Sequence, residues 1–183
     1  MLSLIKERLR DYEGKTIEAL KGICAGVVVP IFEKDGDVHI VLTKRTEDVR
    51  LHKGEVSFPG GMCEDSDGSK VNTALRECCE EIGVPAKDIE VIGKMDDMYT
   101  MTGFVITPYV GIIPYPYVFK TSPGEVAYLI LLPLSYLMEV TPVMEVVEHG
   151  EKVDRVPSFY FEGDRIWGAT ARILLKLKGI IST

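Results

Sequence analysis

RECCEEIG occupies residues 76–83 and combines one arginine with three glutamates. On an α-helix, Glu77, Glu80 and Glu81 stand at positions i, i+3 and i+4, so their carboxylates are expected on one helical face. Carboxylates held this close repel one another, and a hard divalent cation such as Mg²⁺ would relieve the repulsion. Arg76 precedes them and can hold one carboxylate through a bidentate pair. The pattern therefore predicts a helix that binds a metal ion.

The surrounding residues predict where this helix begins and ends. Asp67 or Ser69 can cap the start of a helix over residues 69–82, and Gly83 followed by Pro85 ends it. The apolar stripe expected to face the core consists of Leu75, Cys78, Cys79 and Ile82. A helix of this kind packs through its stripe and leaves its acidic face accessible.

An acidic helix face is by itself weak evidence for a metal site, because many solvated helices carry such runs. The residues upstream favour the metal-binding interpretation. The segment Phe58-Pro59-Gly60-Gly61 is expected to form a tight turn that brings the backbone close to the helix. Carbonyl oxygens of these glycines can complete a coordination sphere made of carboxylates.

Residues 76–84 resemble the second half of the Nudix box, R-E-U-x-E-E-x-G-U, in which U is a bulky apolar residue. Cys78 is a smaller occupant of the first U position than is usual in that family. The resemblance implies an α+β Nudix fold, with a mixed β-sheet sandwiched between α-helices and a loop–helix–loop catalytic motif. Residues 1–183 would form a single Nudix hydrolase domain, with the box at about 61–84.

The resemblance also assigns roles to the charged residues. Nudix enzymes hydrolyse a nucleoside diphosphate linked to another group, with Mg²⁺ or Mn²⁺ as the cofactor. By their positions in the motif, Glu77, Glu80 and Glu81 would bind the metal, and Arg76 would orient the glutamates. These four residues are the expected catalytic group.

The first half of the box departs from the family pattern. That pattern has a glycine fourteen positions and a glutamate eight positions before the arginine, where this chain has Met62 and Gly68. The glycine is instead Gly61, one position earlier, so the loop is expected to be one residue longer. Its acidic members are Glu64, Asp65 and Asp67.

Further motifs are similar to those of coenzyme A pyrophosphatases. They are LTKRT at residues 42–46, the pattern R-x-H-x-G-E-V-x-F-P-G-G at 50–61 and TALRE at 73–77. Weaker similarities follow at 125–134 and 166–170. This resemblance implies hydrolysis of the diphosphate of coenzyme A, or of an acylated or oxidised form. The products would be a phosphopantetheine derivative and adenosine 3′,5′-bisphosphate.

Basic residues gather before the box in an otherwise acidic chain, at Lys44, Arg45, Arg50 and Lys53. Arginine binds phosphate in a bidentate manner and lysine adds a point charge. We therefore expect Arg45, Arg50 and Lys53 to contact substrate phosphates, and Phe58 of the same motif to contact substrate as well. The alternative is that these charges are solvated, or that they pair with acidic neighbours on the loop.

His52 and Glu125 are two further candidates. His52 lies inside the matched motif, where it can shape the substrate loop or make a structural hydrogen bond. Glu125 opens an expected strand after a Pro-Gly pair, and Nudix enzymes often use a further carboxylate from outside the box as ligand or base. The alternative is an ordinary glutamate at a strand edge. The complete expected metal set is Gly61, Glu77, Glu80, Glu81 and Glu125.

The barrier to diphosphate hydrolysis is electrostatic, since a diphosphate dianion repels hydroxide. Metal ions on the glutamates would bridge the phosphate oxygens, acidify a bound water and stabilise the leaving phosphate. Two other functions stay open. One is a Nudix hydrolase for ADP-ribose or a nucleoside diphosphate sugar. The other is a Nudix-fold binding module without activity, which would be free to lose glutamates that this chain retains.

The hydrophobic pattern before the box predicts a hairpin and a loop. Residues 23–32 and 38–43 are β-rich runs around Asp-Gly at 35–36, which is a strong hairpin signal. Residues 44–68 are rich in glycine and charge, and are expected to form a long loop with a short strand at 55–58. A loop of this length in a compact domain is usually functional.

The rest of the chain predicts strands and two more helices. Amphipathic helices are expected at 2–12 and 168–179, and a turn at 162–164. Further strands are expected at 89–99, 104–113, 125–132 and 153–161. Strands mixed with a few helices indicate an α+β fold.

The composition of the 183 residues, with 46% hydrophobic and 27% charged residues, is that of a soluble globular domain. The net charge of −7 disfavours nucleic acid and anionic membrane surfaces as partners, because both need a basic surface. The expected partner is a small-molecule substrate. The longest apolar stretch, residues 127–134, is far shorter than a membrane span.

The N-terminal segment and the cysteines predict a cytoplasmic protein with reduced thiols. Charges interrupt the first residues, so they lack the apolar core of a signal peptide. The cysteines, none of which form a C-x-x-C pair, are Cys24, Cys63, Cys78 and Cys79. The sequence leaves the oligomeric state open, and a homodimer is compatible with it.

Overall fold

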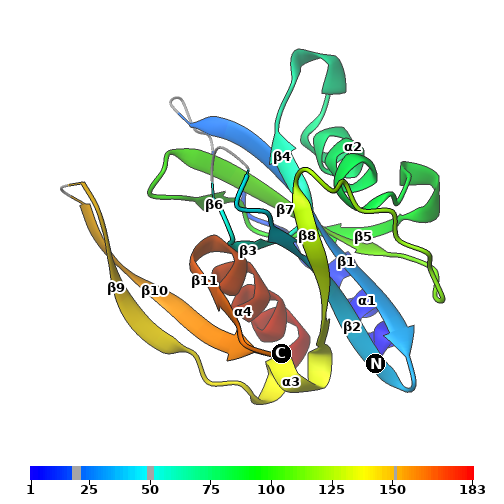
Figure 1. Cartoon of the computed structure of the whole chain (residues 1–183). Coiled ribbons are helices and arrows are strands. Elements are labelled where there is room, and N and C mark those ends of the chain that lie inside the picture. The colour runs from blue at the N-terminus through cyan, green and yellow to red at the C-terminus, as the bar shows by residue number, and fades with distance from the viewer. Residues whose placement is uncertain (18–21, 49–51, 151) are drawn as a thin grey trace.

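The protein is described by a computed structural model over residues 1–17, 22–48, 52–150 and 152–183 (Figure 1). It has an eight-stranded mixed sheet, a three-stranded sheet and helices on both faces of the larger sheet, which confirms the α+β prediction. The helices are α1 (Leu2–Arg10), α2 (Lys70–Ile82), α3 (Leu134–Glu139) and α4 (Gly168–Ser182). The strands of the larger sheet are β1 (Ile23–Lys34), β2 (Asp37–Arg45), β3 (Val56–Ser57), β4 (Gly60–Met62), β5 (Glu90–Lys94), β6 (Met98–Tyr99), β7 (Phe104–Ile112) and β8 (Val126–Pro133).

β1 and β2 form the predicted hairpin at the centre of the larger sheet. Asp35 and Gly36 link them with φ values of 52° and 83°, the pair of positive values that a type I′ turn requires. Along the sheet the order is β3-β2-β1-β7-β5, with β4 also paired to β1, β6 to β7 and β8 to β2. β1 and β7 run parallel, so the sheet is mixed as expected.

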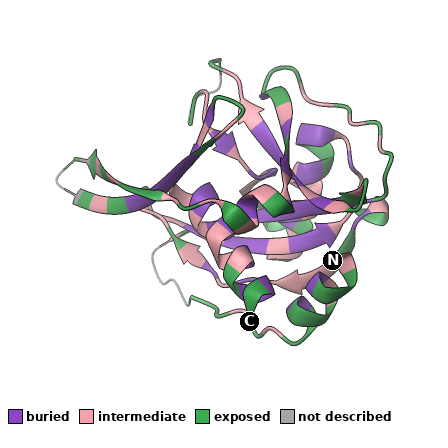
Figure 2. Ribbon diagram, turned by 90° about the horizontal axis from the view of Figure 1, so that it is seen from below, coloured by how far each residue is buried: buried purple, intermediate pink, exposed green. Residues whose placement is uncertain are grey.

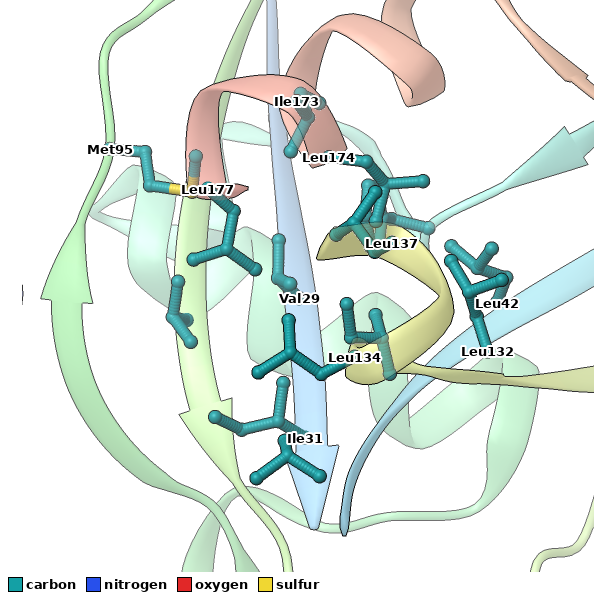
Figure 3. Close-up of a cluster of buried hydrophobic side chains, with 14 of the residues drawn as sticks. Val29, Ile31, Leu42, Met95, Leu132, Leu134, Leu137, Ile173, Leu174 and Leu177 are labelled. Atoms are coloured by element: carbon teal, nitrogen blue, oxygen red, sulfur yellow. The ribbon is translucent and has the colours of Figure 1, made fainter. Parts of the chain in front are cut away.

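β1 is buried on both faces, because its alternate residues enter two hydrophobic clusters. Val28 and Phe32 face α2, while Val29 and Ile31 face α1, α3 and α4 (Figure 3). The cluster that contains Val28 and Phe32 also contains Ala74, Cys78 and Ile82 of α2. Burial of each large aliphatic or aromatic side chain contributes about 1.5–3 kcal/mol. This packing fixes the position of α2 on the sheet.

The smaller sheet has the order β11-β10-β9 and consists of β9 (Val143–His149), β10 (Lys152–Phe161) and β11 (Asp164–Trp167). Its β9–β10 hairpin extends away from the larger sheet, and Figure 2 shows exposed residues toward the hairpin tip. The base is held by Lys44 and Tyr128, which both bind Asp164, each at 2.9 Å. The Thr170 hydroxyl of α4 donates to the carbonyl of Val56 at 2.9 Å.

Several elements differ from the sequence-based prediction. Residues 44–68 contain two short strands, β3 and β4, and a 3₁₀ turn at Asp65–Asp67, where one strand was expected. Residues 89–99 divide into β5 and β6. The pattern did not predict α3, β9 or β11. The described side chains of β9 include no buried one, β11 has four residues and α3 has fewer than two turns, so none shows a full hydrophobic period.

A disulfide joins Cys24 of β1 to Cys63, the residue after β4, with Cα atoms 5.4 Å apart. The expectation of reduced thiols is therefore wrong for this pair. The two residues are 39 positions apart, and the pairing of Ala25 with Met62 brings them together. Cys78 and Cys79 are free. Within the described ranges, no helix is both long and apolar enough to cross a membrane.

Candidate active site

Local signals fix both ends of α2. The Ser69 side chain accepts a hydrogen bond from the Asn72 backbone N–H at 3.3 Å, so Ser69 rather than Asp67 is the N-cap. Gly83 ends the helix in the left-handed conformation, with φ 73°, and its N–H donates to the Cys79 carbonyl at 3.0 Å. The predicted helix is confirmed.

The face that α2 turns to the sheet is shifted from the predicted stripe. Cys78 and Ile82 are buried as expected, and Leu75 is partly buried. Cys79 is exposed, so its prediction was wrong. Successive helical residues are 100° apart, and with Cys78 facing the sheet Cys79 turns outward. Glu81, which precedes Ile82, lies on the buried face in place of Cys79.

The three glutamates of α2 have different environments. The side chain of Glu81 is 2% exposed, that of Glu77 is 17% exposed and that of Glu80 is 57% exposed. Glu77 and Glu81 are one turn apart and lie against β4. The expected single acidic face therefore describes these two residues, while Glu80 lies at its exposed rim.

Arg76 donates hydrogen bonds that orient two of these carboxylates. Its Nη1 donates to Glu77 Oε1 at 2.8 Å and to Glu80 Oε2 at 3.2 Å. Its Nη2 also donates to the Met62 carbonyl at 3.2 Å, which links α2 to β4. The acidic partners raise the pKa of Arg76, so the guanidinium stays charged.

Asp67 forms the bidentate pair that Arg76 was expected to make with a glutamate. Arg76 Nε and Nη2 donate to its two carboxylate oxygens at 2.8 and 3.2 Å. The Glu64 N–H and the Thr73 hydroxyl also donate to Asp67, at 2.9 and 2.8 Å. These bonds, led by the one from Arg76, hold the pKa of Asp67 well below its usual range.

In this chain Asp67 anchors the loop to α2 through Arg76, at one position before the glutamate of the family pattern. The sequence analysis named Asp67 as an acidic loop residue and missed this role. The signal that could have found it is an acidic residue within one position of the expected glutamate, in a loop that is one residue longer.

The backbone of Gly61 lies directly against the Glu77 carboxylate. A side chain at position 61 would place its Cβ 2.4 Å from Glu77 Oε1, far inside van der Waals contact. Gly61 pairs with Gly26 of β1, where a Cβ would lie 2.4 Å from the Lys70 carbonyl oxygen at the start of α2. Two glycines in register thus allow β1, β4 and α2 to approach closely.

Glu81 is a buried carboxylate whose partners are incomplete. Its Oε1 accepts from Arg45 Nη1 at 3.4 Å, which is long for a charged pair. Its Oε2 is buried and meets no hydrogen-bond donor in the described part of the chain, and the buried Nε–H of Arg45 meets no acceptor there. Burial raises the pKa of Glu81 to about 8, opposed by Arg45 and reinforced by Glu77 and Glu125.

The environment of Glu77 is similar to that of Glu81, and it raises the pKa of Glu77 as well. Burial raises its pKa, Arg76 lowers it, and the carboxylates of Glu80 and Glu125 raise it. Glu125 lies just before β8 and is exposed. The charge of Glu125 raises the pKa of both Glu77 and Glu81, and its role as a ligand or base stays a prediction.

The structure places the residues predicted to contact substrate in different environments. Arg45 reaches the site through Glu81, and Lys53 is exposed on the loop before β3. Phe58 is 4% exposed and belongs to the hydrophobic core, so its assignment as a substrate contact is corrected to a packing role. Arg50 lies outside the described residues. Lys44 pairs with Asp164 of β11 at 2.9 Å, and not with an acidic neighbour on the loop.

His52 has a structural contact. Its Nδ1 lies 2.9 Å from Glu55 Oε2, and the hydrogen bond to Glu55 raises the pKa of His52. Its φ of 57° shows a tight local turn. This contact is the structural hydrogen bond that was one of the two roles considered for His52.

The α2–β4 site has the donor set of a divalent-cation site. In the described segments, no three His, Cys, Asp or Glu side chains form a ligand cluster, and Arg45 and Arg76 pair with Glu81 and Glu77. The buried oxygen of Glu81, the raised pKa of both buried glutamates and the Gly61 backbone all fit a hard cation. Such a cation would compensate the burial and repulsion of the carboxylates.

Comparison with known proteins shows the family to which the chain belongs. Residues 23–153 match the NUDIX domain family. NudL of Yersinia pestis (strain Pestoides F), described as an uncharacterized Nudix hydrolase, is 35% identical over 159 residues. These residues are 86% of this chain and 79% of the relative. NudL of Yersinia pseudotuberculosis serotype O:1b is similar to the same extent.

Solved structures share the fold at low sequence identity. The NUDIX domain of Shewanella oneidensis NrtR, complexed with ADP ribose, has a TM-score of 0.52 and 20% identity over 74% of this chain and 86% of that one. A MutT/nudix family protein from Enterococcus faecalis has a TM-score of 0.57 and 15% identity over 97% of this chain and 68% of that one. The family match and the 35% identical relatives show that the chain belongs to the Nudix family and is a Nudix hydrolase.

Proposed function

We propose that this Nudix hydrolase cleaves the diphosphate bond of coenzyme A or of one of its derivatives. The observation that carries the hydrolytic site is the pair Glu77 and Glu81 against β4, with one buried carboxylate oxygen that lacks a donor in the described residues. The choice of coenzyme A rests on the motifs at 42–46 and 50–61, which resemble those of coenzyme A pyrophosphatases.

The metal ligands in this proposal come from α2, β4 and the start of β8. They are Gly61, through its carbonyl oxygen, and Glu77, Glu80, Glu81 and Glu125. Mg²⁺ or Mn²⁺ bound there supplies positive charge that stabilises the leaving phosphate and acidifies a water molecule. Glu125 is exposed beside the buried pair, a position that suits either a ligand or the base that accepts the proton of water.

Arg76 acts as a positioning residue. Its guanidinium is already occupied by Asp67, Met62 and the two glutamates, so it holds the ligands rather than the substrate. The hydrogen bonds to Glu77 and Glu80 fix carboxylate orientation before substrate arrives, which reduces the reorganisation needed in the reaction.

Arg45 is the proposed phosphate contact at the edge of the site. It ends β2, its bond to Glu81 is long, and its Nε is not used by any described residue. A cation that neutralises Glu81 would leave the guanidinium donors available to a diphosphate oxygen. Lys53 and Arg50 remain proposed contacts for further phosphate groups, such as the 3′-phosphate of coenzyme A.

A substrate panel tests this function. Purified protein with Mg²⁺ or Mn²⁺ is incubated with coenzyme A, dephospho-coenzyme A, ADP-ribose and UDP-glucose, and the products are identified by mass. We expect the highest kcat/KM on coenzyme A, with phosphopantetheine and adenosine 3′,5′-bisphosphate as products and no turnover after chelation of the metal. A tenfold or greater preference for ADP-ribose or UDP-glucose would contradict the substrate assignment, and no hydrolysis of any diphosphate would contradict the activity.

A further inference from the structure

The Cys24–Cys63 disulfide joins the start of β1 to the end of β4, the strand that lies against the carboxylate site. Cys24 is the second residue of β1, and Cys63 directly follows β4. The Cys63 N–H also donates to the Cys24 carbonyl at 2.9 Å. Both cysteines are partly exposed rather than buried, so a small thiol has access to the bond.

Three consecutive residues connect this bond to the site. Gly61 lies against the Glu77 carboxylate, and the Met62 carbonyl accepts a hydrogen bond from Arg76 at 3.2 Å. Cys63 is the next residue and is covalently tied to β1. A displacement at Cys63 is therefore transmitted within two residues to the contacts that orient Glu77.

We propose that the Cys24–Cys63 disulfide is a thiol-exchange site that regulates the carboxylate centre. In the oxidised form, the bond holds the end of β4 against β1 and keeps Gly61 and Met62 in contact with α2. In the reduced form, this end of β4 is free to move and the centre is less well ordered. The effects on catalysis and on cation binding rest on the proposed function and its metal site, while the effect on the order of β4 does not.

The exchange is a two-electron reduction by a low-molecular-weight thiol. The thiolate of one molecule attacks one sulfur of the disulfide, which forms a mixed disulfide and releases the other cysteine as a thiolate that takes up a proton. A second molecule of the thiol attacks the mixed disulfide and frees the remaining cysteine. Two small thiols are thereby oxidised to one small disulfide, and Cys24 and Cys63 become thiols.

The fold should persist in the reduced form. The pairing of β4 with β1 includes Gly61 with Gly26 and Gly60 with Val27, which do not depend on the disulfide. The core on both faces of β1 is separate from the bond. We therefore expect a graded loosening of the site, with cation affinity reduced about three- to tenfold, rather than unfolding.

The experiment compares oxidised and reduced protein without substrate. Glutathione buffers of defined ratio set the redox state, which is confirmed by mass after alkylation. Hydrogen exchange of residues 60–67 is measured in the metal-free protein, and Mn²⁺ affinity is measured by electron paramagnetic resonance. We expect faster exchange at 60–63 and weaker Mn²⁺ binding after reduction, and recovery of both after reoxidation with oxidised glutathione.

Two variants serve as controls. Cys79→Ser removes the exposed free thiol and should show the same redox response. Cys24→Ser/Cys63→Ser should match the reduced protein in both oxidised and reduced buffers; if that variant does not fold, reduced Cys79→Ser protein provides the same comparison. Equal exchange rates and equal Mn²⁺ affinity in the two redox states would overturn the proposal, as would failure of the pair to reoxidise. Loss of diphosphate hydrolysis in the substrate panel alone would contradict only the proposed function.

Discussion

Position 61 has room for a glycine and for no other residue. The Cβ of any larger residue would lie 2.4 Å from Glu77 Oε1, so either β4 or the carboxylate must move. We predict that Gly61→Ala lowers kcat/KM at least about tenfold, because a ligand displaced by a fraction of an ångström loses transition-state stabilisation. It should also destabilise the fold by about 1–3 kcal/mol through overpacking.

Gly179→Ala is the matched control for this substitution. Gly179 lies inside α4, and a Cβ there meets no atom of the described structure within 4 Å. Alanine favours the helix by about 1 kcal/mol, so this variant should be as active as the wild type and slightly more stable. Steady-state kinetics and melting curves of both variants provide the test; equal activity of Gly61→Ala and Gly179→Ala would refute the close contact with Glu77.

Asp67 acts on the site through Arg76. Asp67→Asn preserves shape but removes the charge that accepts both guanidinium bonds. Arg76 would then be less constrained, and so would Glu77 and Glu80. We predict that kcat falls about tenfold or more while KM changes little, and that Asp67→Glu restores part of kcat. The measurement is a full kinetic curve at saturating Mg²⁺.

Asp65→Asn provides the comparison for Asp67. Asp65 is exposed and lies in the same 3₁₀ turn. Its substitution should leave kcat within a factor of two of the wild type. The role given to Asp67 would be wrong if both variants lost activity equally, since that result would indicate a general effect of loop charge.

The two adjacent cysteines of α2 lie in different environments. Cys78 is packed against β1, and burial followed by the charge of Glu81 raises its pKa to about 12. Cys79 is exposed. We predict that iodoacetamide modifies Cys79 and not Cys78 in the native protein, and that Cys78 reacts only after unfolding. Peptide mass spectrometry distinguishes the sites, and modification of Cys78 in folded protein would contradict the described packing of α2.

The elements that the sequence predicts well are those with strong local signals. α2 has a serine cap, an amphipathic stripe and a terminal glycine, and the β1–β2 hairpin has its Asp-Gly turn, so both were predicted close to their observed bounds. β9 and β11 lie on either side of β10 in the smaller sheet, and each pairs with β10 rather than with the other. Short, partly exposed strands of this kind depend on tertiary pairing that no local window contains.

The sequence predicted that the three glutamates lie on one helix, but not how far each of them is exposed. A helical wheel places Glu77, Glu80 and Glu81 together, yet the rotation of α2 on the sheet decides that Glu81 is buried and Glu80 is exposed. That rotation depends on contacts with β1, which are distant in sequence. The Cys24–Cys63 bond was missed for the same reason, because it follows from the β1–β4 register.

Asp96 connects three distant parts of the molecule. Its carboxylate accepts hydrogen bonds from the Tyr12 hydroxyl at 2.7 Å and the Lys15 N–H at 2.9 Å, and it pairs with Lys176 of α4 at 2.8 Å. Burial opposes ionisation, but the bonds from Lys176, Lys15 and Tyr12 outweigh it and lower the pKa of Asp96 to about 2. The charged carboxylate therefore stabilises the folded state.

This lowered pKa predicts a pH dependence of stability. Above about pH 4 the carboxyl is ionised in both folded and unfolded chains, and Asp96→Asn should reduce the free energy of unfolding by about 1–2 kcal/mol. As the pH falls from about 4 toward 2, the unfolded chain takes up a proton first and the advantage of the wild type disappears. Denaturant unfolding of both proteins between pH 7 and pH 2.5 measures the difference.

Asp11→Asn is the control for the titration. Asp11 is exposed and lies next to Tyr12, so its substitution alters the local charge without touching the Asp96 contacts. The difference between wild type and this variant should be small at every pH. A pH-independent difference for Asp96→Asn would show that the ion pair and hydrogen bonds do not stabilise the charged form.

The buried carboxylate of Glu81 lies where three elements meet, since β2 supplies Arg45, β4 its glycines and α2 Glu77. Glu81→Gln removes its charge and keeps its shape, and exposed Glu139→Gln of α3 is the matched control. The decisive measurement is kcat on coenzyme A at saturating Mg²⁺, with the melting temperature of each metal-free variant. Loss of a metal ligand predicts a fall in kcat of about 10²-fold or more for Glu81→Gln, an unchanged kcat for Glu139→Gln, and an unchanged or raised melting temperature for both. Retention of near wild-type kcat by folded Glu81→Gln would contradict a carboxylate–metal centre at this position.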